Sequence, residues 1–118
     1  MNFLHLFAHT KNVEAYAAGD VVFRAGDPGT KMYVVLEGRV SIEIHGKRVL
    51  EAGPGELVGE MALIDATARS ATTTALEATK LAVVDEKHFL FMVQQTPFFA
   101  LQVMRVLVSR LRSMDDQL

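Results

Sequence analysis

The sequence has no cysteine, no strong excess of charge and no long apolar run. Without cysteine, the chain has neither a disulfide framework nor a thiolate zinc site, which is compatible with a reducing compartment. A net charge of −2 gives no electrostatic basis for binding nucleic acid. No apolar stretch approaches the ~18–20 residues that cross a bilayer, and residues 1–19 do not resemble a signal peptide. These absences favour a cytoplasmic domain without membrane contact.

Glycine is missing from the second half of the chain, since all eight glycines lie between Gly19 and Gly59. They separate short segments rich in valine, isoleucine and tyrosine, which are typical of brief strands joined by turns. Residues 40–45 alternate strictly, which predicts a strand with its even positions buried and its odd positions, beginning with Ser41, in water. Residues 70–85 predict two further strands. Regular short strands of this kind indicate a closed barrel or jelly roll.

The C-terminal part is expected to be helical. Asp85 can cap a helix over residues 86–95, and Thr96 followed by Pro97 can begin a second helix. In this second helix apolar residues recur every three or four positions, which predicts an amphipathic helix. We expect about half of the apolar stripe to pack on the barrel, whereas the same spacing would also serve a homodimer through this helix. The stripe consists of Leu101, Met104, Leu107 or Val108, Leu111 and Met114.

These patterns together predict one domain over residues 1–118, of the α+β class and mainly β. Its body is an eight-stranded jelly-roll β-barrel over about residues 15–85. A short N-terminal helix precedes the barrel, and two C-terminal helices follow it over about residues 86–115. No internal repeat, low-complexity segment or linker marks a second domain.

One cation, Arg69, stands in a run of alanine, serine and threonine and is the only one between Arg48 and Lys80. A buried arginine is costly unless an anion meets it, so either a carboxylate of the chain or a ligand must neutralise it. Earlier in the chain, Gly59 and Glu60 begin a run that fits one helical turn, whose free amides can bind an anion. Two interpretations stay open: Glu60 pairs with Arg69, or together they bind the hydroxyl and the phosphate of a ribose phosphate.

Residues 55–75 resemble the phosphate-binding cassette of the cyclic nucleotide-binding domain, the family of catabolite activators and protein kinase A regulatory subunits. Two positions depart from the family's pattern, since Ala68 stands where proline is frequent and Val58 where phenylalanine is frequent. The glycine turns before the cassette and the final helix after it extend the similarity over nearly the whole chain. The matching residues are Gly59-Glu60-Met61-Ala62-Leu63-Ile64 and, after the family's usual gap, Arg69-Ser70-Ala71-Thr72.

The resemblance implies a role for each residue of the site. Arg69 would bind the exocyclic oxygens of a cyclic phosphate, and Glu60 would accept a hydrogen bond from the ribose 2′-hydroxyl. Ser70 could contact the phosphate or a guanine amino group, so the resemblance leaves cAMP and cGMP open, with cAMP the commoner ligand. Backbone amides and small side chains would complete the phosphate site at Gly59, Met61, Ala62, Ser70 and Ala71. A residue of the last helix would cover the base, and the candidates are Leu107, Arg110, Leu111 and Met114.

The implied function is cyclic nucleotide binding by a stand-alone, non-catalytic regulatory domain without cofactor or metal, whose C-terminal helices rearrange when the ligand binds. Residues 113–118 are acidic, so we expect no direct DNA binding and an effector protein of unknown identity. One alternative is a degenerate module of the same fold that binds no ligand and acts through protein contacts. Another is a cupin-like metal enzyme, which the scattered histidines disfavour because they form no metal-binding pair.

Overall fold

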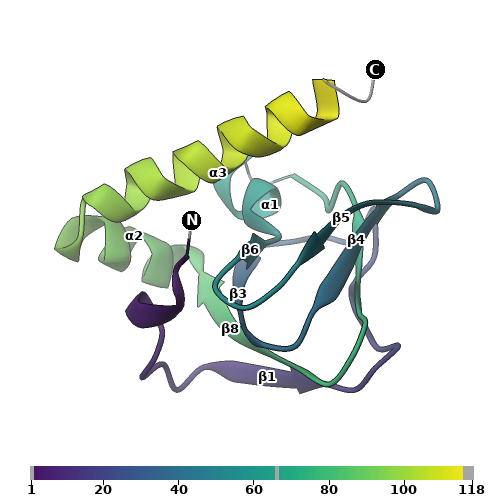
Figure 1. Cartoon of the computed structure of the whole chain (residues 1–118). Helices are drawn as coiled ribbons and strands as arrows, with labels where there is room; N and C mark the ends of the chain where they lie inside the picture. Colours follow the sequence, from purple (N-terminus) through teal and green to yellow (C-terminus); the bar gives the residue numbers. More distant parts are fainter. Residues whose placement is uncertain (1, 66, 116–118) are drawn as a thin grey trace.

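Two antiparallel sheets of four strands each form the body of the chain in a computed structural model that describes residues 2–65 and 67–115 (Figure 1). One sheet has the order β1-β8-β3-β6, with β1 (Val13–Tyr16), β8 (Thr79–Asp85), β3 (Lys31–Glu37) and β6 (Leu57–Val58). The other has the order β2-β7-β4-β5, with β2 (Val21–Phe23), β7 (Thr72–Ala75), β4 (Val40–Ile44) and β5 (Lys47–Ala52).

The described strands pair only within their own sheet, so the body does not close into the barrel that the sequence predicts. Two of the crossings between the sheets join edge strands: β1 leads to β2 through residues 17–20, and β5 leads to β6 through residues 53–56. The edge strands on the two sides of these crossings are not paired with each other. The mainly β architecture is confirmed, with two facing sheets in place of one continuous wall.

The central strands β3 and β8 are buried on both faces, because the sheet that contains them is covered on both sides. Four successive residues are buried in each strand, over 32–35 and 81–84. Alternate residues belong to different clusters: Tyr33 and Leu81 face the second sheet, whereas Met32 and Ala82 face the helices. A strand covered on both faces is a continuous apolar run and not an alternating one.

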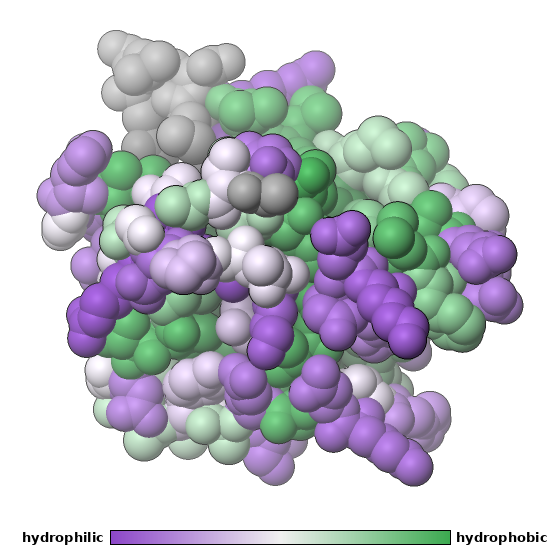
Figure 2. All heavy atoms as spheres, turned by 180° about the vertical axis from the view of Figure 1, so that it is seen from behind, coloured by the Kyte–Doolittle hydropathy of each residue, from purple (hydrophilic) through white to green (hydrophobic). Residues whose placement is uncertain are grey.

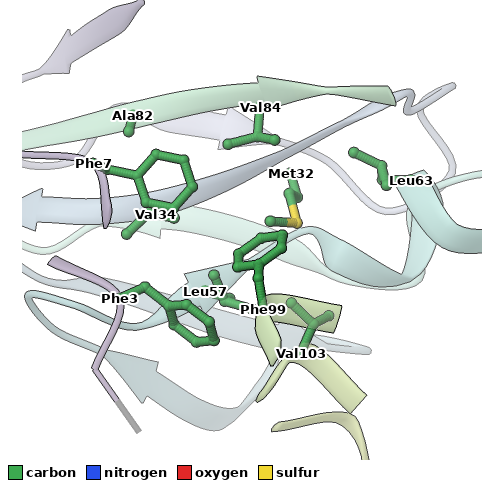
Figure 3. Packing of buried hydrophobic residues seen from close by; sticks show 10 residues of the cluster. All are labelled: Phe3, Phe7, Met32, Val34, Leu57, Leu63, Ala82, Val84, Phe99 and Val103. Carbon is green, nitrogen blue, oxygen red and sulfur yellow. The ribbon is translucent and has the colours of Figure 1, made fainter. Parts of the chain in front are cut away.

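An aromatic cluster holds the N-terminal segment and the beginning of α3 against the outer face of the first sheet (Figure 3). The 3-10 helix η1 (Leu4–Leu6) lies between Phe3 and Phe7, which are both buried. The Phe99 ring of α3 meets the Phe3 ring edge to face, with 5.8 Å between centroids. The expected short N-terminal helix is therefore present as a single 3-10 turn that packs on the body.

Three α-helices complete the chain: α1 (Glu60–Asp65), α2 (Glu86–Gln95) and α3 (Phe98–Asp115). The Asp85 side chain accepts a hydrogen bond from the backbone N of His88 at 2.7 Å, which confirms it as the cap of α2. α3 begins at Phe98, one residue later than the sequence predicts. None of the helices in the described residues has the length and apolar character to cross a membrane.

The side of α3 that packs on the body differs from the predicted one. Of the expected stripe, Leu107 packs against the core cluster, and it does so together with residues on the 99/103/106 side of the helix. The Met114 side chain is not among the parts of the chain that the structure describes. The other members of the stripe are 40–58% exposed: Leu101, Met104, Val108 and Leu111. The helix carries apolar residues on two sides, so its spacing alone cannot decide which side meets the core.

Ser41 is also placed differently, because it is buried where the alternation of β4 predicts contact with water. It lies opposite Glu51 of β5 in the strand register. Glu51 pairs with Arg39 at 3.3 Å and with Arg48 at 3.4 Å. Long charged side chains cover neighbouring surface with their aliphatic stems, which accounts for the burial of a short serine opposite this cluster.

Replacing Phe99 by alanine should lower the free energy of unfolding by about 3–5 kcal/mol, because the ring is fully buried against other aromatic rings. Urea unfolding followed by circular dichroism measures this loss. The neighbouring Phe98 is 53% exposed, so Phe98→Ala is the matched control and should cost less than about 1 kcal/mol. Equal losses for the two variants would contradict the assigned packing of α3.

Candidate functional site

A pocket of about 180 Å³ opens between the second sheet, α1 and the C-terminal half of α3. Its wall on the sheet side is apolar, with Ile42 and Leu50 among its residues. The pocket is also lined by every residue that the sequence predicts as a ligand contact before α3: Gly59, Glu60, Met61, Ala62, Arg69, Ser70 and Ala71. The structure therefore brings the two halves of the predicted cassette together around one cavity.

Arg69 is 6% exposed and lies at one end of this pocket. One guanidinium nitrogen donates a hydrogen bond to the Gly59 carbonyl oxygen at 2.9 Å. The guanidinium carbon lies 4.2 Å from the centre of the Phe23 ring and 5.8 Å from that of Tyr33. Within the described residues, no carboxylate forms an ion pair with it, and its Nε has no hydrogen-bond partner. The Glu60–Arg69 pair, one of the two interpretations of the sequence, is not formed.

The loop over residues 24–29 fixes the backbone of this arginine. The Arg69 backbone N donates to the Asp27 carbonyl oxygen at 2.8 Å, and its own carbonyl accepts from the Gly26 N at 2.8 Å. Two glycines make room for the side chain. A Cβ on Gly29 would lie 2.4 Å from Nε, and one on Gly59 would lie 2.7 Å from a terminal guanidinium nitrogen. The glycine turns seen in the sequence thus shape the space around the cation.

Burial lowers the pKa of the Arg69 guanidinium from its usual value. The charges of Tyr33, Asp27 and Glu60 raise this pKa, but burial remains the largest effect. Burial likewise raises the pKa of Tyr33. The cation is therefore desolvated, and ring faces, the Tyr33 side chain and one carbonyl oxygen contact it, with no carboxylate pairing in the described residues. An anion that enters the pocket would gain a charge-assisted contact that water does not screen.

Glu60 pairs with Arg110 of α3. The carboxylate is 3% exposed, and the second guanidinium nitrogen of Arg110 donates to the Leu57 carbonyl oxygen. Of the candidates for covering the base, Arg110 is the one that lines the pocket. Leu107 packs against the core cluster, Leu111 is 58% exposed, and the Met114 side chain lies outside the described residues. α3 thus closes one side of the pocket through an ion pair.

No sequence motif marks the apolar wall of the pocket or the threonine within it. The wall consists of side chains from strands β2, β4 and β5, and the alternation of β4 could have indicated that Ile42 and Ile44 face inward. Thr73 of β7 is fully buried, and its hydroxyl has no hydrogen-bond partner in the described residues. The residues missed are Phe23, Ile42, Ile44, Val49, Leu50, Thr73 and Ser113.

A family model described as the cyclic nucleotide-binding domain matches residues 13–96. The chain belongs to this family. The cyclic AMP receptor protein of Thermus thermophilus is 35% identical to the chain over 108 residues, which cover 87% of the chain and 50% of the receptor. The crystal structure of the Thermus thermophilus catabolite activator protein has a TM-score of 0.81 at 33% identity, over 89% of the chain and 52% of that protein.

A third cyclic nucleotide-binding relative is the EAL enzyme Bd1971. Its cAMP-bound form has a TM-score of 0.65 at 37% identity, and its cGMP-bound form has 0.67 at 34%. These matches cover 89% of the chain and 30% and 29% of that enzyme. The chain spans about half the length of the cyclic AMP receptor protein, and a smaller share of this enzyme. Within the described residues, no group of three or more acidic, histidine or cysteine side chains is placed to hold a metal ion.

A double-mutant cycle with Glu60→Gln and Arg110→Met should give a coupling energy of about 1–3 kcal/mol, because the carboxylate is buried and the pair is largely screened from solvent. The ligand-free protein is unfolded in urea for each variant. The exposed pair Arg39–Glu51 is the matched control and should give about 0.2–1 kcal/mol. A coupling energy no larger than that of the surface pair would refute the buried contact.

Proposed function

We propose that this pocket binds a cyclic nucleotide and that the chain is a non-catalytic regulatory domain. The observation that carries the proposal is the buried Arg69, which has no carboxylate partner in the described residues. A cyclic phosphate supplies the anion that this cation lacks. Glu60 supplies an acceptor for the ribose 2′-hydroxyl, and the apolar wall around Ile42 and Leu50 receives the base. Family membership supports the same assignment.

cAMP is our first choice of ligand and cGMP the second. The curated relative from Thermus is a receptor for cyclic AMP, whereas Bd1971 has structures with either nucleotide. Ser70, the residue that could contact a guanine amino group, is exposed at the pocket. The cytoplasmic location, the lack of DNA or membrane contact and the identity of the effector protein stay predictions from the sequence.

The ion pair between Glu60 and Arg110 suggests how occupancy of the pocket reaches α3. The carboxylate that holds α3 is the same group that we assign to the ribose hydroxyl. A ligand therefore changes the partners of Glu60 and, through Arg110, the position of the C-terminal half of α3. The ligand shifts this equilibrium only as far as its affinities for the two positions differ. Movement of α3 is then the signal that an effector protein recognises.

The exposed side of α3 supports a homodimer of this chain. Leu101, Met104, Val108 and Leu111 follow a three-four spacing, which is the a/d pattern of a coiled coil. Each of them is at least 40% exposed. Figure 2 shows hydrophobic atoms gathered at the end of the molecule where α2 and α3 meet, at the right of that view. Pairing of two α3 helices would remove this stripe from water and couple the two pockets.

The wild-type chain should bind cAMP or cGMP saturably in a calorimetric titration, and Arg69→Ala should weaken that binding by about 2–5 kcal/mol, because it removes the buried charged contact for the phosphate. Arg24→Ala is the control, since Arg24 is exposed on the neighbouring loop, and it should leave the affinity unchanged. Unchanged affinity in a folded Arg69→Ala variant would remove the assigned role. A wild-type chain that binds neither nucleotide would indicate the degenerate interaction module instead.

The double variant Met104→Glu/Val108→Glu should sediment as a monomer of 13.0 kDa, because two charges per chain would lie in the apolar seam. Analytical ultracentrifugation of the full chain at tens of micromolar measures the mass, and we expect a dimer for the wild type. Gln102→Glu, on another side of α3, is the control and should leave the dimer intact. A monomeric wild type, or a double variant that still dimerises, would refute pairing through this stripe.

A further inference from the structure

Thr73 is a buried polar side chain that the assignments above do not use. It is fully buried in β7, and its Oγ1 atom has no hydrogen-bond partner in the described residues. Thr73 also lines the pocket. A buried hydroxyl without a partner costs free energy, whereas valine would fill a similar volume without that cost. The hydroxyl is therefore explained best by a partner that enters the pocket.

The strand register places Thr73 in a row of pocket residues across the second sheet. Its direct neighbours are Phe23 on β2 and Ile42 on β4, and Ile42 in turn lies opposite Leu50 on β5. All four side chains line the pocket, and the threonine is the polar one among them. Directly opposite residues share one face of a sheet, and neighbouring strands lie about 4.8 Å apart. The row thus has a fixed order from Phe23 to Leu50.

This order can be matched to the parts of a nucleotide. The Arg69 guanidinium lies on the Phe23 ring at 4.2 Å, which places the phosphate at that end of the row. Ile42 and Leu50 form the apolar end, which receives the base. Thr73 stands between the two ends, one strand from Phe23 and two strands from Leu50. The part of a cyclic nucleotide between phosphate and base is the sugar with its ester oxygens.

We propose that the Thr73 hydroxyl donates a hydrogen bond to an oxygen of the sugar–phosphate ring of the bound nucleotide. The proposal rests on the proposed function of the pocket. A threonine hydroxyl can donate, and the ring and ester oxygens of this part of the ligand are acceptors. Glu60 approaches the sugar from α1, so the sugar is held from the sheet side as well as from the helix side. The contact is independent of the base and serves cAMP and cGMP alike.

The test compares wild type, Thr73→Val and Thr73→Ser by calorimetric titration with cAMP and with cGMP. Thr73→Val should weaken binding of both nucleotides by about 3- to 10-fold and to a similar extent, since one neutral hydrogen bond common to both is lost. Thr73→Ser keeps the hydroxyl and should stay within about 2-fold of wild type. Thr74→Val is the matched control, because Thr74 does not line the pocket and belongs to the opposite face of the same strand.

A second readout separates this role from a structural one. The thermal midpoint of ligand-free Thr73→Val should equal or exceed that of wild type, because the hydroxyl has no protein partner to lose. Unchanged nucleotide affinity in Thr73→Val, or a loss confined to one of the two nucleotides, would overturn the proposal while the pocket's function stands. A wild-type chain that binds neither nucleotide would overturn both. If Thr73→Val does not fold, Thr73→Ala replaces it in the comparison with Thr73→Ser.

Discussion

A guanidinium held out of water without a carboxylate is the constraint on which the rest of the site depends. In the described residues Arg69 contacts ring faces, the Tyr33 side chain and one carbonyl oxygen, and none of these contacts carries a carboxylate charge. The loop over residues 24–29 therefore holds the arginine backbone by hydrogen bonds in both directions. Positions 29 and 59 are glycines, and a Cβ at either position would collide with the guanidinium. The cation is positioned before any ligand arrives, so little of the binding free energy is spent on ordering it.

The two ends of α3 are attached to the body in different ways. At its beginning, Phe99 packs into an aromatic cluster with rings from the N-terminal segment and from α2. Toward its end, Arg110 reaches Glu60 and the Leu57 carbonyl oxygen through one guanidinium group. The burial of the Phe99 ring does not depend on what the pocket contains. The contact between Arg110 and Glu60 lies at the pocket, so a ligand competes with it directly. We therefore expect any movement of α3 on ligand binding to pivot near Phe99 and to be largest beyond Arg110.

The sequence predicted which residues gather around one pocket better than it predicted the packed side of the last helix, and the reason is distance along the chain. Residues 59–62 and 69–71 are close in the sequence, so one local motif contained the whole cassette, and the structure gathers it around one pocket. The partner of Glu60 lies 50 residues away, and nothing in the spacing of α3 indicated that Arg110 would reach it. The same helix is apolar on two sides, so its periodicity predicted an amphipathic helix but not the side that packs. The prediction that Ser41 is exposed was wrong, because the alternation within β4 gives no information on the long side chains around it.

The charged side chains around the pocket include more positive than negative groups, and this excess suits a singly charged anion. The charged side chains that line it in the described residues are Glu60, Arg69 and Arg110, which leaves one net positive charge. Before a ligand enters, Glu60 and Arg110 neutralise each other, so this excess belongs to Arg69. A cyclic phosphodiester carries a single negative charge and balances the excess, whereas a phosphate monoester carries about −1.5 to −2 near neutral pH. In a desolvated pocket the surplus charge of a monoester would stay uncompensated. Pairing within the protein thus leaves one positive charge for a ligand to balance, and a singly charged phosphodiester meets that requirement.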